Sequence, residues 1–110
     1  MDKDWLRRLA DTTAALPPQP DKQWREVMRH GSMYAGLYAP RGVDEQKPHA
    51  QDELYVVVAG EARFDRNGEA AQVAAGDILF VPARMDHRFE GMSDDFAVWA
   101  IFWGPPGGEG

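Results

Sequence analysis

Three side chains in the middle of the sequence have the chemistry of a metal site. His49 stands four residues before Glu53, and His87 follows further along the chain. Two imidazoles and one carboxylate are a ligand set that suits a divalent transition metal and leaves positions for water or substrate. The chain contains no cysteine, which excludes a thiolate site and a cysteine nucleophile. The remaining histidine, His30, lies outside this pattern.

A β-strand is predicted directly after the first two of these residues. Leu54–Ala59 is rich in β-branched residues, and in an extended segment Glu53 shares one face with Tyr55 and Val57. Asp52 would then point to the opposite face and be solvated. A buried carboxylate needs a cation or hydrogen-bond donors, because losing its hydration is costly. We therefore expect Glu53, and not Asp52, to enter the interior.

His87 begins a second predicted strand, His87–Glu90, in which Phe89 shares its face. Asn67-Gly68 is a strong hairpin signal, because both central residues of a type I′ turn need positive φ. The other predicted strands are Ser32–Ala39, Ala62–Asp65, Ala70–Val73, Ile78–Val81 and Phe96–Trp103. Short strands at this spacing predict a sandwich or a barrel.

The N-terminal sixteen residues are predicted to form a helix whose apolar stripe includes Trp5 and Leu9, with Asp2 or Asp4 as its cap and Pro17 at its end. The expected organisation is a helix and proline-rich linker over 1–23, a barrel over 24–104 and a flexible tail over 105–110. Several strands are apolar on both faces, so the outer face needs cover from the helix or a second copy. We therefore predict a homodimer.

Composition limits the partners. The chain has 110 residues and a formal net charge of −6, with no cluster of Lys or Arg. Nucleic acid and anionic membranes are therefore not expected as partners. The first sixteen residues carry too many charges for a signal peptide, and no run is apolar enough to span a membrane. A cytoplasmic location is the prediction.

The spacing of the candidate ligands resembles the cupin family. Its first motif reads G-x5-H-x-H-x3-E-x6-G and its second reads G-x5-P-x-G-x2-H-x3-N. The second half of the first motif is matched by His49-x3-Glu53-x6-Gly60, and the spacing of the second by Gly76-x5-Pro82-x-Arg84-x2-His87-x3-Gly91. The resemblance covers residues 42 to 91 and implies an all-β fold, the cupin double-stranded β-helix or jelly-roll barrel, here with a short N-terminal helix.

Four positions depart from the family pattern. Lys47 stands where the first histidine would be, and Gly42 is one residue closer to it than the motif asks. Arg84 replaces the internal glycine of the second motif, and Gly91 replaces its terminal Asn. A protonated lysine offers no lone pair to a metal. The expected site is therefore His49, Glu53 and His87 with water, and Gln51 is the candidate fourth ligand.

The resemblance implies a metal-binding protein whose ion is iron, manganese, zinc or nickel. The first hypothesis is a metal-dependent oxygenase, such as a non-haem dioxygenase, acting on a small organic molecule, because two histidines and a carboxylate are the ligands of such enzymes. The alternatives are a non-catalytic module that binds a metal or small ligand, and a structural dimer with a vestigial pocket. Tyr55, Phe89 and Trp99 are the candidate lining of a substrate pocket, and Tyr55 or Arg88 would orient the substrate.

Overall fold

The computed structural model describes residues 3–19, 23–44 and 46–109. Within them the chain forms one short helix and eight strands: α1 (Leu9–Ala14), β1 (Trp24–His30), β2 (Met33–Tyr38), β3 (Asp52–Ala59), β4 (Glu61–Arg66), β5 (Glu69–Ala74), β6 (Ile78–Val81), β7 (His87–Glu90) and β8 (Ala97–Trp103).

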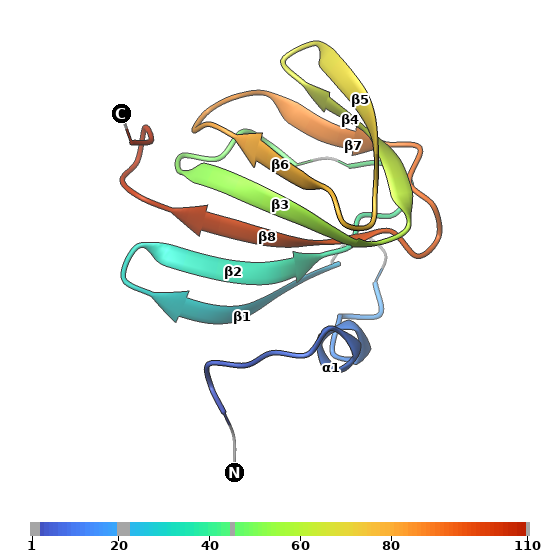
Figure 1. Cartoon of the computed structure of the whole chain (residues 1–110), viewed down its shortest axis with the longest axis vertical. Coiled ribbons are helices and arrows are strands. Elements are labelled where there is room, and N and C mark those ends of the chain that lie inside the picture. Colours follow the sequence, from blue (N-terminus) through green and yellow to red (C-terminus); the bar gives the residue numbers. More distant parts are fainter. Residues whose placement is uncertain (1–2, 20–22, 45, 110) are drawn as a thin grey trace.

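The strands form two antiparallel sheets. The larger sheet has the order β1-β2-β8-β3-β6, and the smaller has the order β5-β4-β7 (Figure 1). β8 therefore lies at the centre of the larger sheet, paired with β2 on one side and with β3 on the other. β3 and β7, which carry two of the candidate ligands, belong to different sheets. The site is thus built by bringing the two sheets together.

The main core lies between the sheets and is rich in aromatic residues. Phe64 and Phe89 pair across β4 and β7, and Phe89 packs against both Tyr55 and Phe96 at ring-centroid distances of 5.0 and 4.9 Å. These side chains are nearly inaccessible to solvent. Burying a large apolar side chain contributes roughly 1.5–3 kcal/mol, so this cluster is a major source of the stability that holds the two sheets together.

Seven of the eight strands follow the predictions closely, whereas β1 was not predicted as a separate strand. The pairing of β1 with β2 is interrupted by a bulge between Glu26 and Met28. A bulge inserts one extra residue and shifts the alternation of side chains between the faces. The half-buried positions of β1 therefore do not follow a period of two, and the usual strand signal is lost.

The N-terminal helix is shorter than predicted. It covers only Leu9–Ala14 and has Arg8 at its N-cap with no side-chain cap; Asp4 lies in a turn outside it, and Asp2 is outside the described residues. The Arg7 guanidinium binds the carbonyls of Lys3, Leu6 and Val27. These bonds engage backbone groups that a longer helix would need for its own ladder.

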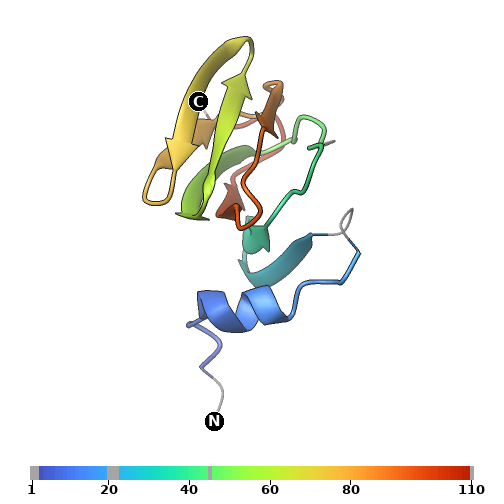
Figure 2. The same ribbon diagram turned by 90° about the vertical axis from the view of Figure 1, so that its right-hand side faces the viewer.

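The expected apolar stripe of the helix is correct for Leu9 and wrong for Trp5. Leu9 packs with Leu16 against a second cluster on the outer side of the larger sheet, which contains Leu37, Ala39 and Ala97. Trp5 precedes the helix and is 71% exposed. α1 lies beside the β1–β2 end of the molecule (Figure 2). The helix therefore covers only part of the outer face.

Turn geometry follows the sequence where the signal is strong. Asn67 and Gly68 have φ values of 52° and 87° between β4 and β5, which confirms the predicted hairpin turn.

Within the described residues, no helix is long and apolar enough to cross a membrane. Residues of the predicted tail contact the barrel: Gly107 N–H donates to the Ala50 carbonyl at 2.7 Å, and Glu109 N–H donates to Asp52.

Candidate metal centre

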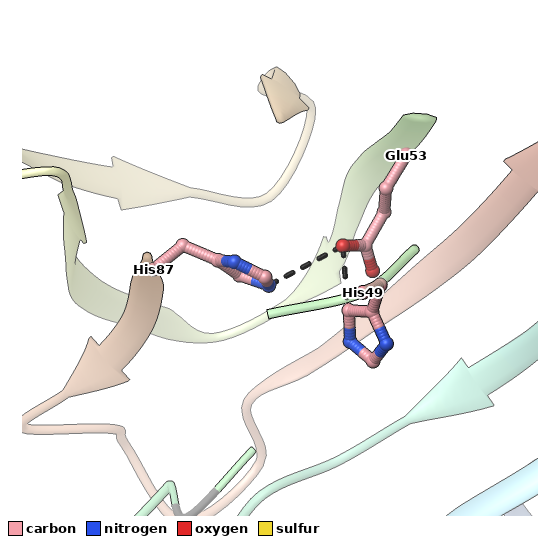
Figure 3. Close-up of side chains that lie close together, drawn as sticks. All are labelled: His49, Glu53 and His87. Atoms are coloured by element: carbon pink, nitrogen blue, oxygen red, sulfur yellow. Dashed lines mark ion pairs between the residues drawn. The ribbon is translucent and has the colours of Figure 1, made fainter. Parts of the chain in front are cut away.

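The three predicted ligands meet at one end of the space between the sheets. Glu53 lies near the start of β3, His87 is the first residue of β7, and His49 lies in the segment before β3. One donor atom from each lies within 4.8 Å of the others, and the three side chains point toward one another (Figure 3). Glu53 and His87 are buried and His49 is half-buried. The sequence prediction of this cluster agrees with the geometry.

Glu53 is the least compensated side chain of the cluster. It is 1% exposed, and neither carboxylate oxygen has a hydrogen-bond partner among the described residues. Oε1 lies 3.3 Å from His87 Nε2 and 4.0 Å from His49 Nε2, contacts that become ion pairs only when a ring is protonated. A buried carboxylate in this state is strongly disfavoured unless a positive charge is close. The donor set therefore fits a divalent cation.

His87 is oriented by a backbone carbonyl. Its Nδ1 lies 2.9 Å from the Met85 carbonyl oxygen, which can only accept, so Nδ1 carries the proton. In the neutral ring Nε2 then has a free lone pair directed at Glu53. A histidine ligand fixed in this way is the usual arrangement around protein-bound metals. Burial acts to lower the pKa of His87, but the nearby Glu53 carboxylate and the Met85 carbonyl together outweigh it and raise the pKa.

His49 differs from His87 in its surroundings. Its ring packs edge-on against Phe102 at a centroid distance of 4.8 Å. Burial is the main cause of a lowered pKa for His49, opposed by the negative charge of Glu53. The ring of His49 is therefore more readily neutral than an exposed histidine, and a neutral imidazole is the form that binds a metal.

Two residues that the sequence analysis did not select, Gln46 and Asp44, border the cluster. Gln46 Oε1 lies 3.1 Å from His49 Nε2 and accepts a hydrogen bond of 2.9 Å from the Tyr55 hydroxyl. Its Nε2 donates to Asp44 Oδ2 at 2.7 Å. No family motif marks either position, and Gln46 lies outside the strands. Only the three-dimensional path of the segment before β3 brings its amide to the site.

The predicted fourth ligand, Gln51, lies elsewhere. Its amide Nε2 donates to the carbonyls of Ser32 and Gly104, at 3.0 and 2.8 Å, and it is absent from the cavity wall. The prediction assumed that residues 49 to 53 alternate as a strand, but β3 begins only at Asp52. Lys47, which occupies the place of the family's first histidine, is exposed.

A cavity of about 270 Å³ opens beside the cluster. Gly36 and Ala100 are paired across β2 and β8, and Ala100 lines the cavity. A side chain at position 36 would collide with the Trp24 ring, so glycine is required for Trp24 to fold over β2. The wall consists of Trp24, Tyr34, Tyr38, Gln46, His49, Glu53, Tyr55, Ala100 and Phe102.

Of the three residues predicted to line a substrate pocket, one borders this cavity. Tyr55 lines the cavity, and its hydroxyl lies 3.0 Å from His87 Nε2. Burial first, and then the charge of Glu53, raise the pKa of Tyr55 well above its usual value, so the phenol keeps its proton. Phe89 belongs to the core and does not line the cavity. Trp99 packs on the outer cluster with Leu37, because it lies on the opposite face of β8.

The fold and the site together define a small β-barrel with a histidine–carboxylate pocket at one end. A family model described as a cupin domain matches residues 36–103. The chain belongs to the cupin family, and the predicted cupin barrel is thereby confirmed. The uncharacterized protein SCO3923 of Streptomyces coelicolor is 42% identical over 88 residues, which is 78% of this chain and 83% of that relative.

Solved structures agree on the fold. A cupin-2 domain containing protein from Shewanella frigidimarina aligns with a TM-score of 0.72 at 16% identity, over 92% of this chain and 94% of its own. A cupin 2 conserved barrel domain protein from Salinispora arenicola aligns with a TM-score of 0.67 at 21% identity, over 90% and 87%. At these identities the likeness establishes the barrel alone.

Two departures from the cupin motifs have a clear backbone consequence. Arg84, in the place of a glycine, has φ of 65°, and Gly91, in the place of Asn, has φ of 59°. The left-handed conformation is easy for Gly and tolerable for Asn, but costly for other residues. Both positions therefore hold a left-handed backbone, and at Arg84 this costs strain.

Proposed function

We propose that this protein binds a divalent transition metal, namely iron, manganese, zinc or nickel, through His49, Glu53 and His87. The observation that carries the proposal is the buried Glu53 carboxylate, whose oxygens lack hydrogen-bond partners among the described residues. The fixed tautomer of His87 supports it, because Nε2 is the nitrogen that faces the carboxylate. Each feature is costly for a protein that holds no cation and useful for one that does.

We propose further that the site is that of a metal-dependent oxygenase. When bound to two imidazoles and one carboxylate, iron supplies open positions at which oxygen and a substrate can react. The residues of this chain would set the conditions for that reaction. The apolar side chains of the cavity wall lower the polarity around the cluster, and the protonated Tyr55 hydroxyl lies beside His87 Nε2 while it donates to Gln46.

The cavity limits the substrate to a small molecule. Its volume of about 270 Å³ corresponds to about nine water molecules at the volume of the liquid. Four aromatic side chains besides Tyr55 form its wall, and no Lys or Arg is among the described lining residues. An organic molecule with a flat apolar body would fit these walls, and its polar group would then face the metal. Arg88 is exposed and outside this wall, so of the two residues expected to orient the substrate only Tyr55 lines the cavity.

A second candidate is a non-catalytic module that binds a metal or a small ligand. It is favoured by the scarcity of acid–base groups in the described part of the cavity wall. Apart from the three proposed ligands, only the Tyr55, Tyr34 and Tyr38 hydroxyls can ionise there, and the pKa of each is raised, mainly by burial. They are therefore protonated at neutral pH and cannot act as bases. Such a module would hold its ligand without converting it.

Metal analysis of protein purified without an affinity tag tests the first proposal. Close to one equivalent of a transition metal is expected for the wild type and little for a His87→Ala variant. A metal-free wild type that also fails to take up Fe²⁺, Mn²⁺, Zn²⁺ or Ni²⁺ would refute it. Oxygen uptake by the Fe²⁺-loaded protein with a panel of small aromatic compounds then separates the two functions. Uptake above the His87→Ala background supports the oxygenase, and binding without uptake supports the module.

We also propose that the protein is a homodimer, and we retain the cytoplasmic location as a prediction from the sequence. The outer face of β6 supports the dimer: Ile78 and Phe80 are 66% and 46% exposed there, while α1 covers the other end of the same sheet. Light scattering at micromolar concentration should give about twice the mass of one chain. If light scattering gave the mass of a single chain, and the same mass for a Phe80→Ser variant, the dimer would be refuted.

A further inference from the structure

The amide of Gln46 lies beside His49, one residue before the motif position at which the sequence lacks a histidine. Lys47, at the motif position of the first histidine, is exposed, whereas the neighbouring Gln46 side chain lines the cavity. We infer that Gln46 Oε1 is a fourth protein ligand of the metal and that Asp44 is the residue that positions it. The inference rests on the proposed metal site and extends it to two residues outside the family motifs.

The distances around His49 carry the first step. Two ligand atoms that are each about 2.1 Å from one ion lie about 3.0 Å apart at a right angle and about 3.4 Å apart in a tetrahedron. Gln46 Oε1 and His49 Nε2 are 3.1 Å apart, and His87 Nε2 and Glu53 Oε1 are 3.3 Å apart. Both pairs therefore have the spacing of adjacent ligands on a single ion.

The orientation of the amide carries the second step. The NH₂ group of Gln46 donates to the Asp44 carboxylate, which has no hydrogen to offer in return. The opposite orientation would place the amide oxygen against that carboxylate. Asp44 therefore fixes the oxygen on the side of His49 and Tyr55. An amide oxygen has two lone pairs, so it can accept the Tyr55 O–H and still face an ion.

Asp44 is itself held in place from three sides. It is 6% exposed; Oδ2 accepts the Phe89 N–H at 2.8 Å, and Oδ1 accepts the Gln46 N–H at 3.2 Å. The Tyr38 hydroxyl also donates to Oδ1. All of these partners donate to Asp44. A carboxylate can accept at both of its oxygens, whereas an amide could accept at only one. The buried Asp44 carboxylate is thus fixed in position, and through the Gln46 amide it reaches the metal cluster.

The test uses Co²⁺ as the probe, because its visible spectrum changes with the number and type of its ligands. Metal-free full-length wild type, Gln46→Ala and Gln51→Ala are titrated with Co²⁺ against a competing chelator. Gln51 is a matched control, since it is the same residue type near His49 but faces away from the cavity. Gln46→Ala should weaken Co²⁺ binding by about tenfold and change its visible bands. Gln51→Ala should do neither.

Asp44→Asn tests the positioning role. An amide at position 44 has one oxygen for donors on two sides. If that oxygen stays toward the Phe89 N–H and the Gln46 NH₂, the new NH₂ group faces the backbone N–H of Gln46, and the reverse orientation faces the other two donors. Either clash between donors displaces Gln46 from its place beside His49. The Co²⁺ bands of Asp44→Asn should then resemble those of Gln46→Ala. Circular dichroism and Tm show whether this variant is folded, and if it is not, Gln46→Ala decides alone.

Each outcome separates the inference from the function beneath it. Wild type that binds Co²⁺ while Gln46→Ala keeps the same affinity and bands would overturn the ligand role and leave the metal site intact. Weaker binding with unchanged bands would also overturn it, because Gln46 would then act only on its neighbours. Wild type that binds no Co²⁺ would overturn both the metal site and this inference.

Discussion

The two faces of β3 treat neighbouring carboxylates in opposite ways. Glu53 faces the space between the sheets, where its oxygens lack hydrogen-bond partners among the described residues. Asp52 faces the other side, where Oδ1 accepts the Ala83 N–H and Oδ2 accepts the Glu109 N–H, each at 2.9 Å. These two bonds, that of Glu109 foremost, lower the pKa of Asp52. One carboxylate is satisfied by the backbone, and the other has no such partner among the described residues.

The difference separates a structural role from a functional one. Asp52 connects β3 to the loop before β7 and to the C-terminal segment, so its charge is used within the fold. The charge of Glu53 has no such use, and in a folded chain an uncompensated buried charge is a liability unless a ligand compensates it. The experiments below test this contrast, beginning with the largest expected effect.

Removal of the metal should lower the stability of the protein without unfolding the barrel. At a metal concentration of a hundred times Kd, binding adds about 2.7 kcal/mol to the free energy of unfolding. Addition of a chelator should therefore lower Tm while the circular dichroism at room temperature remains that of a β protein, because the aromatic core holds the sheets. Complete unfolding at room temperature on chelation would show that the ion, and not the core, maintains the fold.

Replacement of Glu53 by alanine should weaken metal binding at least tenfold, or about 1.4 kcal/mol, because it removes the only carboxylate of the proposed ligand set. A competition titration with a chromogenic chelator measures the change. Asp52→Ala is the matched control, since it removes a carboxylate from the next residue on the other face. Equal losses in the two variants would contradict the assignment of Glu53 to the site.

Acid should weaken metal binding in two stages. The raised pKa of His87 means that protons compete with the metal there already above pH 6.5, whereas the lowered pKa of His49 delays competition until below it. Affinity measured from pH 8 to 5 should therefore fall by several-fold at first and more steeply at the end. In metal-free protein the raised pKa of His87 stabilises the fold below pH 6.5, and this contribution is lost as the pH rises through that pKa. A flat affinity profile would exclude both imidazoles as ligands.

Replacement of Asp52 by alanine should lower Tm by a few degrees and leave metal affinity nearly unchanged. The variant leaves the N–H groups of Ala83 and Glu109 without their acceptor, and losing a hydrogen bond of this partly buried kind costs about 1 kcal/mol. Thermal melts of metal-free protein isolate this effect from that of the ion. Asp94→Ala, at an exposed carboxylate, is the control and should melt like the wild type.

The inward face of β3 could be predicted because it depends on local alternation. Glu53, Tyr55 and Val57 are each at most 1% exposed, as their shared parity requires. For Asp52, the direction of the side chain could be predicted but its burial could not. Its outward direction was correct, but it is 7% exposed and not solvated, because the segment after β8 returns to cover it. Contacts between segments so far apart in sequence leave no local pattern.

The same distinction separates the ligands from their surroundings. His49, Glu53 and His87 follow from motif spacing, and the structure brings their donor atoms within 4.8 Å of one another. Gln46 depends on the path of an irregular segment, and Trp99 was misplaced because both faces of β8 are apolar. A period of two tells which residues share a face, but it does not tell which face is inside when both are apolar. In the structure, Leu9 and Leu16 pack on the outer cluster that also contacts Trp99, so this side chain lies on the outer face of β8.

The loop that carries Arg84 contacts both Asp52 and the segment of His49, and replacement of Arg84 gives the smallest expected effect on stability. The loop that carries it donates the Ala83 N–H to Asp52 and the Arg84 N–H to the His49 carbonyl. Both bonds use backbone groups, which a glycine at position 84 would retain. Arg84→Gly should therefore leave metal affinity unchanged. It should also relieve the left-handed strain at φ of 65° and stabilise the fold by up to about 1 kcal/mol.

The gain from Arg84→Gly is limited by two opposing effects: glycine gives the unfolded chain more freedom, and the exposed guanidinium loses its position beside Gly107. Ala83→Gly is the matched control. Position 83 has no positive φ, so glycine there increases only the freedom of the unfolded chain and should lower stability by about 0.5–1 kcal/mol. Urea titrations of the metal-free variants measure both changes. If Arg84→Gly were destabilised as much as Ala83→Gly, the backbone strain assigned to position 84 would be absent, and the arginine would stabilise the turn through its side chain instead.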